Sequence, residues 1–512
     1  MTRRLGPSVE SSLLSLAVIA AVALVLSFVA VLPSSSPSQA SAAQGVTAAG
    51  DGGSPLASGG AEANGTGTSG QGSGGSTTGS SSGGPQRSAA AGNASGGGGT
   101  ALQCAVGRNG GSTDTGVTAT SIKLAATVVT DGPGASFLAP EQVGLRAVVD
   151  KTNRAGGVCG RRISLSLNND SWDAQRGEQY IQNFVEGDQV FALASSDSEG
   201  LRAADSYLAQ HQVPVVGTDG MLIQQYRNPW IWPVATSTIS TMHVMAKNAY
   251  DRGARRFAIV FDDEYHFGVE GAYAFDQAVK RLTGSDIPNF DSSLKSCNGR
   301  FCGIQPAQSS YASQAQTFND ACYNSAQQGG TCDFAAYLLE PDTALSFAQA
   351  GHNSTPQIGQ GAAQPLFTYD FAQNCKSFCD GWWVWTGYNP PIGTDAGLAG
   401  VATYVQDVNR ESSSVDTLNQ FLEGGYDGML LLVTALQKVG PNLTRAGLKA
   451  ALDSMTYDSG LSSPLTWRPG NHFANTGSRA FIMRYQGDRF TGFADAQTGF
   501  IHDPWVGQDG GA

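Results

Sequence analysis

The amino-acid sequence predicts an α/β protein in which an N-terminal apolar helix and a disordered linker precede two doubly wound, parallel-sheet lobes. From about Gly116 onward, short apolar runs rich in β-branched residues alternate with amphipathic segments of helical period. Parallel strands need helical crossovers, so this alternation favours parallel sheets. The chain has 512 residues, which suits two such lobes better than one large sheet.

The first segment, residues 1–35, is predicted to be a secretory signal or a membrane anchor. Arg3 and Arg4 precede an uncharged apolar run of 20 residues from Leu13 to Leu32, which is long enough to cross a bilayer. A plausible cleavage site, 40–42, lies eight residues beyond that run. We favour an uncleaved anchor that contacts the membrane through residues 13–32. With either outcome the rest of the chain is exported.

A flexible tether is predicted for residues 36–103. This stretch consists largely of Ser, Gly, Ala and Thr, and its charged residues are Asp51, Glu62 and Arg87. Such a composition cannot bury enough apolar surface to offset the entropy of ordering the chain.

The folded part begins with the apolar run "SIKLAATVV", and the helix after it is predicted to end at Gly156 and Gly157. The next helix places Tyr180, Ile181 and Phe184 on one face. The predicted strands are 121–129, 162–167, 190–194, 213–217, 256–261, 334–339, 365–369 and 382–386. The predicted helices are 140–154, 174–186, 200–210, 237–251, 269–282, 314–328, 343–351, 398–410, 418–439 and 444–455.

All eight cysteines follow the tether, and an even number in an exported chain favours disulfides. Proximity in the sequence suggests three pairs, and the fourth pair takes the two that remain. The pairs are Cys297 with Cys302, Cys322 with Cys332, Cys375 with Cys379, and Cys104 with Cys159. A metal site at Cys375 and Cys379 is the rival interpretation, but no second pair has a matching spacing.

Polar and acidic loops follow the predicted strands, at the edge of a parallel sheet where ligands bind. Ser and Asp also cap the helices that follow, so capping is the competing explanation for any single residue. No hydrolase, metalloprotease or phosphate-loop motif is present, and the six histidines are scattered. A net charge of −12 without a basic patch argues against nucleic-acid binding. We therefore expect no cofactor, no metal and no enzymatic activity.

Several stretches together resemble the type I periplasmic-binding-protein fold, in the branch of leucine/isoleucine/valine-binding proteins of ABC importers. Among them are "GLRAVVDKTNRAGGVCGRRISL", "YLAQHQVPVVG", "IVFDDEYHFGVEGAYAF" and "YDGMLLLVTALQKVG". The resemblance implies two lobes joined by three crossings, near Ala235, Tyr388 and Leu465. Residues 104–235 and 389–464 would form one lobe, and residues 236–388 and 465–505 the other.

The resemblance also implies a set of ligand-binding positions. They are Phe137, Ser196, Asp197, Ser198, Thr218, Asp219, Tyr265, Phe267 and Asp370. By the same resemblance, Phe137 packs on the ligand side chain and Asp370 binds its ammonium group. Asp197 stands where the family has a hydroxyl that holds the ligand carboxylate. An unpaired buried carboxylate there disfavours an anionic ligand end.

The function that the resemblance implies is an extracytoplasmic solute-binding protein that delivers a small polar ligand to an ABC permease in the membrane. An amino acid, an amide or an amine would suit the acidic residues. Two alternatives remain open. One is a surface receptor that senses its ligand without transport, and the other is an extracellular hydrolase, for which the sequence contains no supporting motif.

Overall fold

The computed structural model describes residues 104, 108–322, 332–351, 359–393, 395–473, 479–486, 489–492 and 501–509. The apolar segment 13–32 and the tether 36–103 lie outside this set. Among the helices that are described, none is both long enough and apolar enough to cross a membrane.

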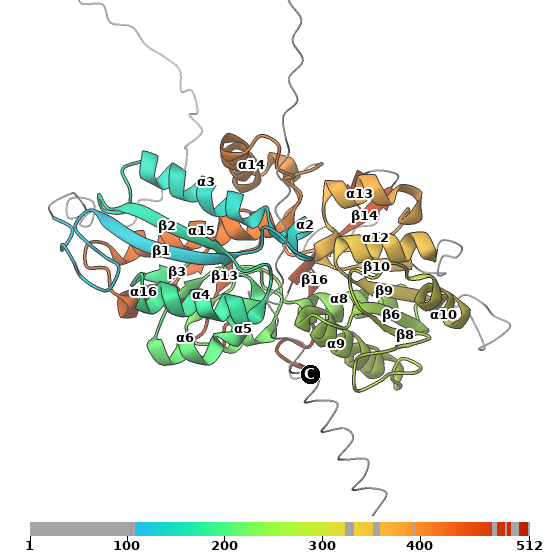
Figure 1. Ribbon diagram of the computed structural model, residues 1–512. Helices are drawn as coiled ribbons and strands as arrows, with labels where there is room; N and C mark the ends of the chain where they lie inside the picture. The colour runs from blue at the N-terminus through green and yellow to red at the C-terminus, as the bar shows by residue number, and fades with distance from the viewer. Residues whose placement is uncertain are drawn as a thin grey trace, which may run out of the picture. The chain divides into compact units, whose positions relative to one another are not determined.

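The first sheet is five-stranded and parallel, with strand order β2-β1-β3-β4-β5 (Figure 1). Its strands are β1 (Ser121–Val128), β2 (Arg162–Asn169), β3 (Ala192–Leu193), β4 (Val215–Val216) and β5 (Ile231–Trp232). Ile122, Leu124 and Ala126 of β1 belong to one apolar cluster, and Ala125 belongs to another on the opposite face. This alternation shows why helices cover both faces of the sheet.

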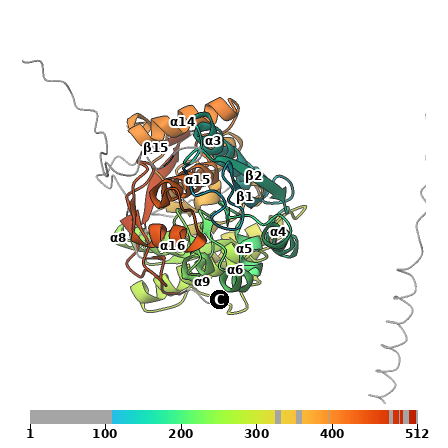
Figure 2. The same cartoon turned by 90° about the vertical axis from the view of Figure 1, so that its left-hand side faces the viewer.

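Helices from two distant parts of the chain cover the first sheet, and we call the sheet with these helices lobe 1. Its helices are α2 (Ala135–Leu138), α3 (Glu141–Arg154), α4 (Ala174–Glu186), α5 (Ser198–Ala203), α6 (Asp205–His211), α7 (Ile223–Arg227), α14 (Ala399–Glu411), α15 (Gln420–Val439) and α16 (Arg445–Ser454). Figure 2 shows α14 and α15 beside α3, and α16 packs against α15. At Gly217, a side chain would meet the Cα of Gly428 at 2.6 Å, so glycine permits the close packing of α15 on the end of β4.

The second sheet has nine strands in the described residues, with main order β15-β14-β11-β10-β9-β6-β8-β7. They are β6 (Phe257–Asp262), β7 (Cys297–Asn298), β8 (Phe301–Ile304), β9 (Phe334–Leu338), β10 (Gly359–Ala362), β11 (Trp383–Thr386), β14 (Arg479–Gln486), β15 (Arg489–Gly492) and β16 (Ile501–His502). Strands β8, β6, β9, β10 and β11 run parallel. Strands β14 and β15 extend the sheet in antiparallel fashion.

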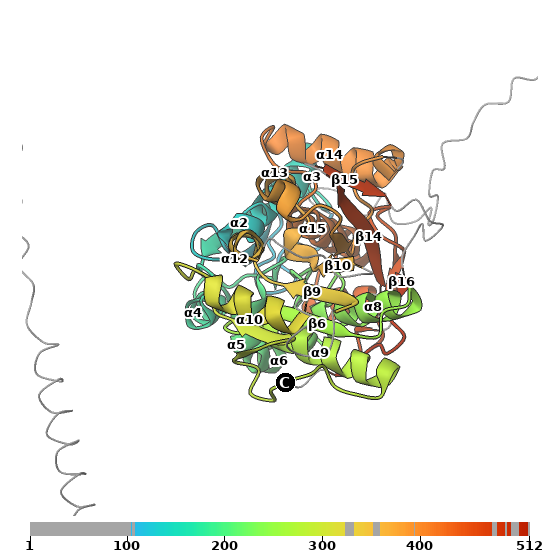
Figure 3. The ribbon, with the colours of Figure 1, turned by 90° about the vertical axis from the view of Figure 1, so that its right-hand side faces the viewer.

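Helices also cover both faces of the second sheet, and we call this sheet with its helices lobe 2. Its helices are α8 (Thr238–Asp251), α9 (His266–Thr283), α10 (Ala312–Cys322), α12 (Pro341–Ala350) and α13 (Tyr369–Cys375). Ile259 and Phe261 of β6 pack in the cluster of α8 and α9, whereas Ala258 and Val260 pack in the cluster of α10 and α12. Figure 3 shows these helices around β6 and β9.

The chain passes between the two lobes three times. It leaves β5 of lobe 1 for α8 of lobe 2, and later leaves β11 of lobe 2 for α14 and α15 of lobe 1. It returns to lobe 2 after β12 (Thr456–Tyr457) and β13 (Leu465–Thr466), a separate two-stranded sheet, and enters β14. The sheet of lobe 1 is parallel, as predicted. In lobe 2 the antiparallel strands β7, β14 and β15 add to the predicted parallel strands.

One predicted strand is wrong. Residues 365–369 form no strand. Pro365 lacks an N–H group for strand pairing and lies in a 3₁₀ turn, Gln364–Leu366. The strand is β10, just before it, in the glycine-rich run "GQGA". A side chain at Gly361 would meet Phe334 at 2.6 Å and Trp385 at 2.8 Å, so glycine is required beneath these rings.

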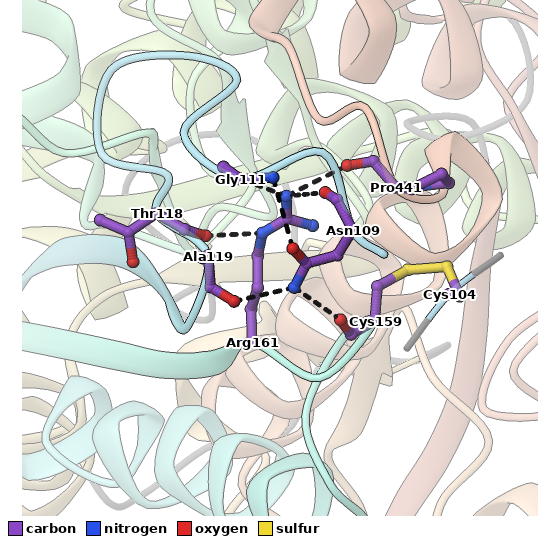
Figure 4. Close-up of a disulfide and its surroundings, with 8 residues drawn as sticks. All are labelled: Cys104, Asn109, Gly111, Thr118, Ala119, Cys159, Arg161 and Pro441. Carbon is purple, nitrogen blue, oxygen red and sulfur yellow. Dashed lines mark hydrogen bonds between the residues drawn. A yellow bond between two sulfur atoms is a disulfide. The ribbon is translucent and has the colours of Figure 1, made fainter. Parts of the chain in front are cut away.

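Four disulfides form, in the pairing that proximity suggests: Cys104–Cys159, Cys297–Cys302, Cys322–Cys332 and Cys375–Cys379. Beside Cys104–Cys159, the buried guanidinium of Arg161 donates hydrogen bonds to four backbone carbonyls, those of Asn109, Gly111, Thr118 and Pro441 (Figure 4). The disulfide and this arginine together fix the start of the folded part against lobe 1.

A histidine clamp fixes the segment after β16 to helix α8. The buried ring of His243 contacts Asp503 through Nδ1 at 3.0 Å and Asp509 through Nε2 at 2.9 Å. Burial acts to lower the pKa of His243, but the hydrogen bonds and charges of the two aspartates outweigh it and raise the pKa. The imidazolium form of the ring is therefore stabilised.

We expect the clamp to lose strength as the pH rises. The pKa of His243 is higher in the folded than in the unfolded chain, so its contribution is complete below about pH 6.5 and disappears as the pH rises through the folded value. Each unit of elevation contributes about 1.4 kcal/mol. Chemical denaturation from pH 6 to 9 should show a steeper loss of unfolding free energy for the parent than for His243→Gln. The exposed-site variant His211→Gln should follow the parent, and equal slopes for the parent and His243→Gln would contradict the clamp.

Candidate functional site

The loop after β3 turns two predicted site residues back onto the sheet. Asp197 caps helix α5: its Oδ1 accepts from the backbone N–H of Gly200 at 3.0 Å. Its Oδ2 accepts from Thr127 Oγ1 at 2.6 Å, and Ser196 Oγ accepts from the backbone N–H of Thr127 at 3.2 Å. Both side chains are buried, so Ser196 and Asp197 serve the internal structure of this strand end.

Ser198 and Asp219 join the loops after β3 and β4. The backbone N–H of Ser198 donates to Asp219 Oδ2 at 2.7 Å, and Gln225 donates to Asp219 Oδ1 at 3.1 Å. Thr218 Oγ1 donates to the side-chain oxygen of Gln225 at 3.2 Å. In the described residues the buried Ser198 Oγ has no hydrogen-bond partner. It is therefore an available polar atom at this edge of lobe 1.

The buried carboxyl groups of Asp170 and Asp197 lie close together. Burial, followed by the charge of the neighbouring Asp197, raises the pKa of Asp170 to about 10. Asp219 lies near the same group: burial, with an added effect of the Asp197 charge, raises its pKa to about 7.

Further buried carboxyl groups lie where α15 and α3 approach these strand ends. Burial raises the pKa of Glu141 and of Glu423 well above the ordinary range. Both carboxyl oxygens of Glu423 and the hydroxyl of Tyr388 have no hydrogen-bond partner in the described residues. Burial also raises the pKa of Asp427 to about 6. This end of lobe 1 therefore holds several buried carboxyl groups whose pKa values are raised by burial.

Lobe 2 presents its own strand end to the same region. Asp262 ends β6, and its Oδ1 accepts from the backbone N–H groups of Glu264 at 3.0 Å and Tyr265 at 3.3 Å. Burial raises the pKa of Asp262 to about 8. This turn sets Tyr265 and the buried Phe267 at the start of α9.

Two polar contacts join the lobes at this place. The backbone N–H of His266 donates to Glu199 Oε1 at 3.1 Å, and its ring Nδ1 also lies 3.1 Å from that carboxylate. Glu270 of lobe 2 accepts from the backbone N–H of Ile223 in lobe 1 at 3.1 Å. The acidic strand ends of lobe 1 therefore face α9 of lobe 2 directly.

An aromatic stack joins the lobes beside these contacts. Trp172, from the loop after β2, stacks on Tyr265 with ring centroids 4.1 Å apart and planes inclined by 20°. It lies 5.7 Å from Phe267 and meets Phe137 edge-on at 5.5 Å. Each such ring pair contributes about 0.5–1.5 kcal/mol beyond its buried area. The structure thus brings Phe137, Tyr265 and Phe267 together through a residue that the sequence analysis did not select.

At the rim of this contact lies a cavity of about 200 Å³. Pro133 lines it from lobe 1, and Gln308 and Tyr311 line it from lobe 2. The loops at 130–133 and 305–311 therefore mark the mouth between the lobes.

Asp370 does not directly follow a strand, in contrast to the sequence prediction. It is exposed in the first turn of α13, eight residues after Ala362 ends β10. The polar residue that follows β10 closely is Gln364, which is buried and donates to Thr238 Oγ1 at 3.4 Å. Its Oε1 has no hydrogen-bond partner in the described residues. The predicted strand at 365–369 led to the choice of Asp370, whereas Gln364 is the polar residue that closely follows β10.

Within the described ranges, no group of three or more His, Cys, Asp or Glu residues is arranged to hold a metal ion. The arrangement instead offers buried carboxyl groups, hydroxyls and an amide, beside aromatic rings, between two α/β lobes. These are features of a protein that encloses a small organic solute.

The chain belongs to the periplasmic binding protein family, whose model matches residues 121–489. Among solved structures it is similar to a branched-chain amino acid ABC transporter protein from Thermus thermophilus with bound valine, at 12% identity and a TM-score of 0.63, covering 75% of this chain and 97% of that one. It is also similar to a fatty acid ABC transporter substrate-binding protein from Thermomonospora curvata, at 17% identity and a TM-score of 0.61, covering 78% and 95%. No curated protein sequence matches this chain.

We expect Asp219→Asn to change how stability depends on pH. The folded pKa of about 7 lies above the ordinary aspartate value, so the contribution of Asp219 is complete below about pH 4 and is lost as the pH rises through 7. Three pKa units set an upper limit of about 4 kcal/mol. The difference in unfolding free energy between Asp219→Asn and the parent should therefore grow in favour of the variant from pH 4 to pH 8. Asp188→Asn, at an exposed turn, is the control, and a difference that does not vary with pH would contradict the prediction.

Proposed function

We propose that this chain is the extracytoplasmic solute-binding component of an ABC importer and that it closes two lobes on a small polar ligand. In this proposal residues 104–235 and 389–464 move as one lobe and residues 236–388 and 465–505 as the other. The ligand is passed to a permease in the membrane. Four disulfides are typical of an exported chain and support this location.

The observation that carries the proposal is the meeting of the strand ends of both lobes. The loops after β2, β3 and β4 of lobe 1 contact the start of α9, directly after β6 of lobe 2. Open α/β sheets bind ligands at the carboxyl ends of their strands. The chain crosses between the lobes three times, which allows them to open and close as bodies.

The ligand that suits this site carries an amine, an amide or another group rich in N–H donors. The buried Asp170, Asp197 and Asp219 have no ion-pair partner among the described residues, and Gln364 adds a free acceptor oxygen. A ligand carboxylate next to these groups would find no cationic partner and would keep them protonated. An ammonium group would instead form charge-assisted hydrogen bonds of about 1.5–3 kcal/mol each.

The two similar structures are of proteins named for different ligand classes, branched-chain amino acids and fatty acids. Both carry a carboxylate, for which Asp197 and Asp219 offer no cationic partner. We therefore place amines, amides and amino acids bound through their ammonium group ahead of fatty acids for this chain.

A set of compounds that share one branched alkyl group tests the ligand class. Thermal denaturation of the full chain at neutral pH should show stabilisation by isopentylamine and L-leucinamide and none by 4-methylpentanoate, with L-leucine between them. A solute at one hundred times its Kd adds about 2.7 kcal/mol to the unfolding free energy. Stabilisation by 4-methylpentanoate alone would reject the proposed ligand class.

Two variants distinguish the placement of the polar contact in lobe 2. Gln364→Ala removes a buried acceptor, so it should weaken binding of the most stabilising compound in that set about tenfold, or 1.4 kcal/mol. Asp370→Asn changes an exposed side chain on α13 and serves as the matched control, with unchanged affinity by calorimetry. Weaker binding by Asp370→Asn, with unchanged binding by Gln364→Ala, would place this polar contact at Asp370 instead.

A further inference from the structure

The loop that carries Trp172 has an unusual backbone. Ser171 and Trp172 both have left-handed backbone angles, with φ of +57° and +62°. Residues other than glycine adopt this conformation at a cost, and they keep it when the surroundings hold them there. Two such residues in succession turn the indole of Trp172 away from its own strand.

Hydrogen bonds hold this loop from several sides. The backbone N–H of Trp172 donates to Asp170 Oδ1 at 2.9 Å. Asn169 Oδ1 accepts from the backbone N–H of Thr130 at 2.9 Å and of Ser171 at 3.1 Å, which ties the loops after β1 and β2 together. The buried Asp170 therefore positions Trp172 directly.

The loop after β1 provides a seat for the indole. A side chain at Gly134 would meet Trp172 Cε3 at 2.8 Å, so the glycine leaves the space that the ring occupies. Phe137 meets the ring edge-on from the same loop. The indole is 3% exposed, although the polar loop that carries it follows an edge strand of the sheet.

Lobe 2 supplies the other half of this burial. Tyr265 lies parallel to the indole at 4.1 Å and Phe267 lies beyond it, both from the start of α9. Opening the lobes would separate Trp172 from both rings and expose it to water. The seat in lobe 1 and the strained backbone fix the indole before contact, so little conformational freedom is lost when the lobes meet.

We propose that Trp172 is the positioning residue for ligand binding, a latch of lobe 1 that stacks on Tyr265 and sets the closed arrangement of the lobes. This inference rests on the proposed function in that it assumes that the lobes open and close. The latch acts on the relative position of the lobes and not on the ligand itself.

Distances across the mouth test the latch without a ligand. Spin labels carried by noncanonical amino acids at the exposed Gln175 and Ser309 report on the separation of the two lobes in the full chain. The parent should give a main population at short distance. Trp172→Ala should increase the long-distance population at least fivefold, and Trp172→Phe, which keeps a ring for stacking, should restore most of the short one.

Two further variants guard against a purely structural effect. Tyr265→Ala removes the other half of the stack and should open the lobes as Trp172→Ala does, while the double variant adds nothing further. Tyr207→Ala is the matched control, because Tyr207 stacks on His211 at the same 4.1 Å within lobe 1. It should leave the distances unchanged.

Each outcome decides the inference. A distance distribution equal to that of the parent in folded Trp172→Ala and Tyr265→Ala overturns the latch, as does an additive double variant. Failure of every compound in the alkyl set to stabilise the chain counts against the proposed ligand class and leaves the distance result valid. The two proposals can therefore fail separately.

Discussion

Lobe 1 buries several carboxyl groups at its strand ends, and no basic side chain of the described residues pairs with Glu141, Asp170, Asp219 or Glu423. Moving an ionised carboxylate out of water costs several kcal/mol unless a partner compensates for it. The protein meets this constraint with protons, as the raised pKa values of Asp170 and Asp219 indicate. The closed arrangement of the lobes depends on the same groups, since Asp170 holds Trp172 and Asp219 holds the turn at Ser198.

This constraint links stability to binding. Protonated carboxyl groups are tolerated in the free protein, yet they are poised to ionise when a cationic group arrives. A ligand ammonium would replace the protons and turn a cost of burial into charge-assisted hydrogen bonds. A ligand carboxylate would gain no such ion pair from these groups. In the proposed function the site selects its ligand by charge, and the stack of Trp172 on Tyr265 sets the arrangement of the lobes that encloses the ligand.

The sequence predicted much of the fold, because periodicity and helix caps are local signals. Helix α4 has the predicted bounds, with Asp173 as its cap, and the alternation of strands and helices in both lobes follows the apolar pattern. The strand β10 was not predicted, because Gly361 in it is required by contacts with the rings of Phe334 and Trp385, which lie far away in the sequence. A run of this composition carries no strand signal by itself.

The site was predictable at the strand ends of lobe 1 and less so elsewhere. Ser198 and Asp219 stand together because the carboxyl ends of neighbouring parallel strands meet at one edge. Trp172 was overlooked because the residues around it in the sequence are polar, and rings of lobe 2 supply part of its burial. An aromatic residue isolated in a polar loop after a strand is the signal that could have identified it. Gln364 could not be selected from the sequence, because that choice requires knowing that β10 ends just before it.

The central claim is that buried, protonated carboxyl groups receive a cationic or N–H-rich ligand. Calorimetric titration of the full chain with isopentylamine, repeated at one pH in buffers of different ionisation enthalpy, measures the protons exchanged on binding. The account predicts that binding releases protons near neutral pH, and that Asp219→Asn releases fewer. Binding without proton release, or with proton uptake, would contradict it.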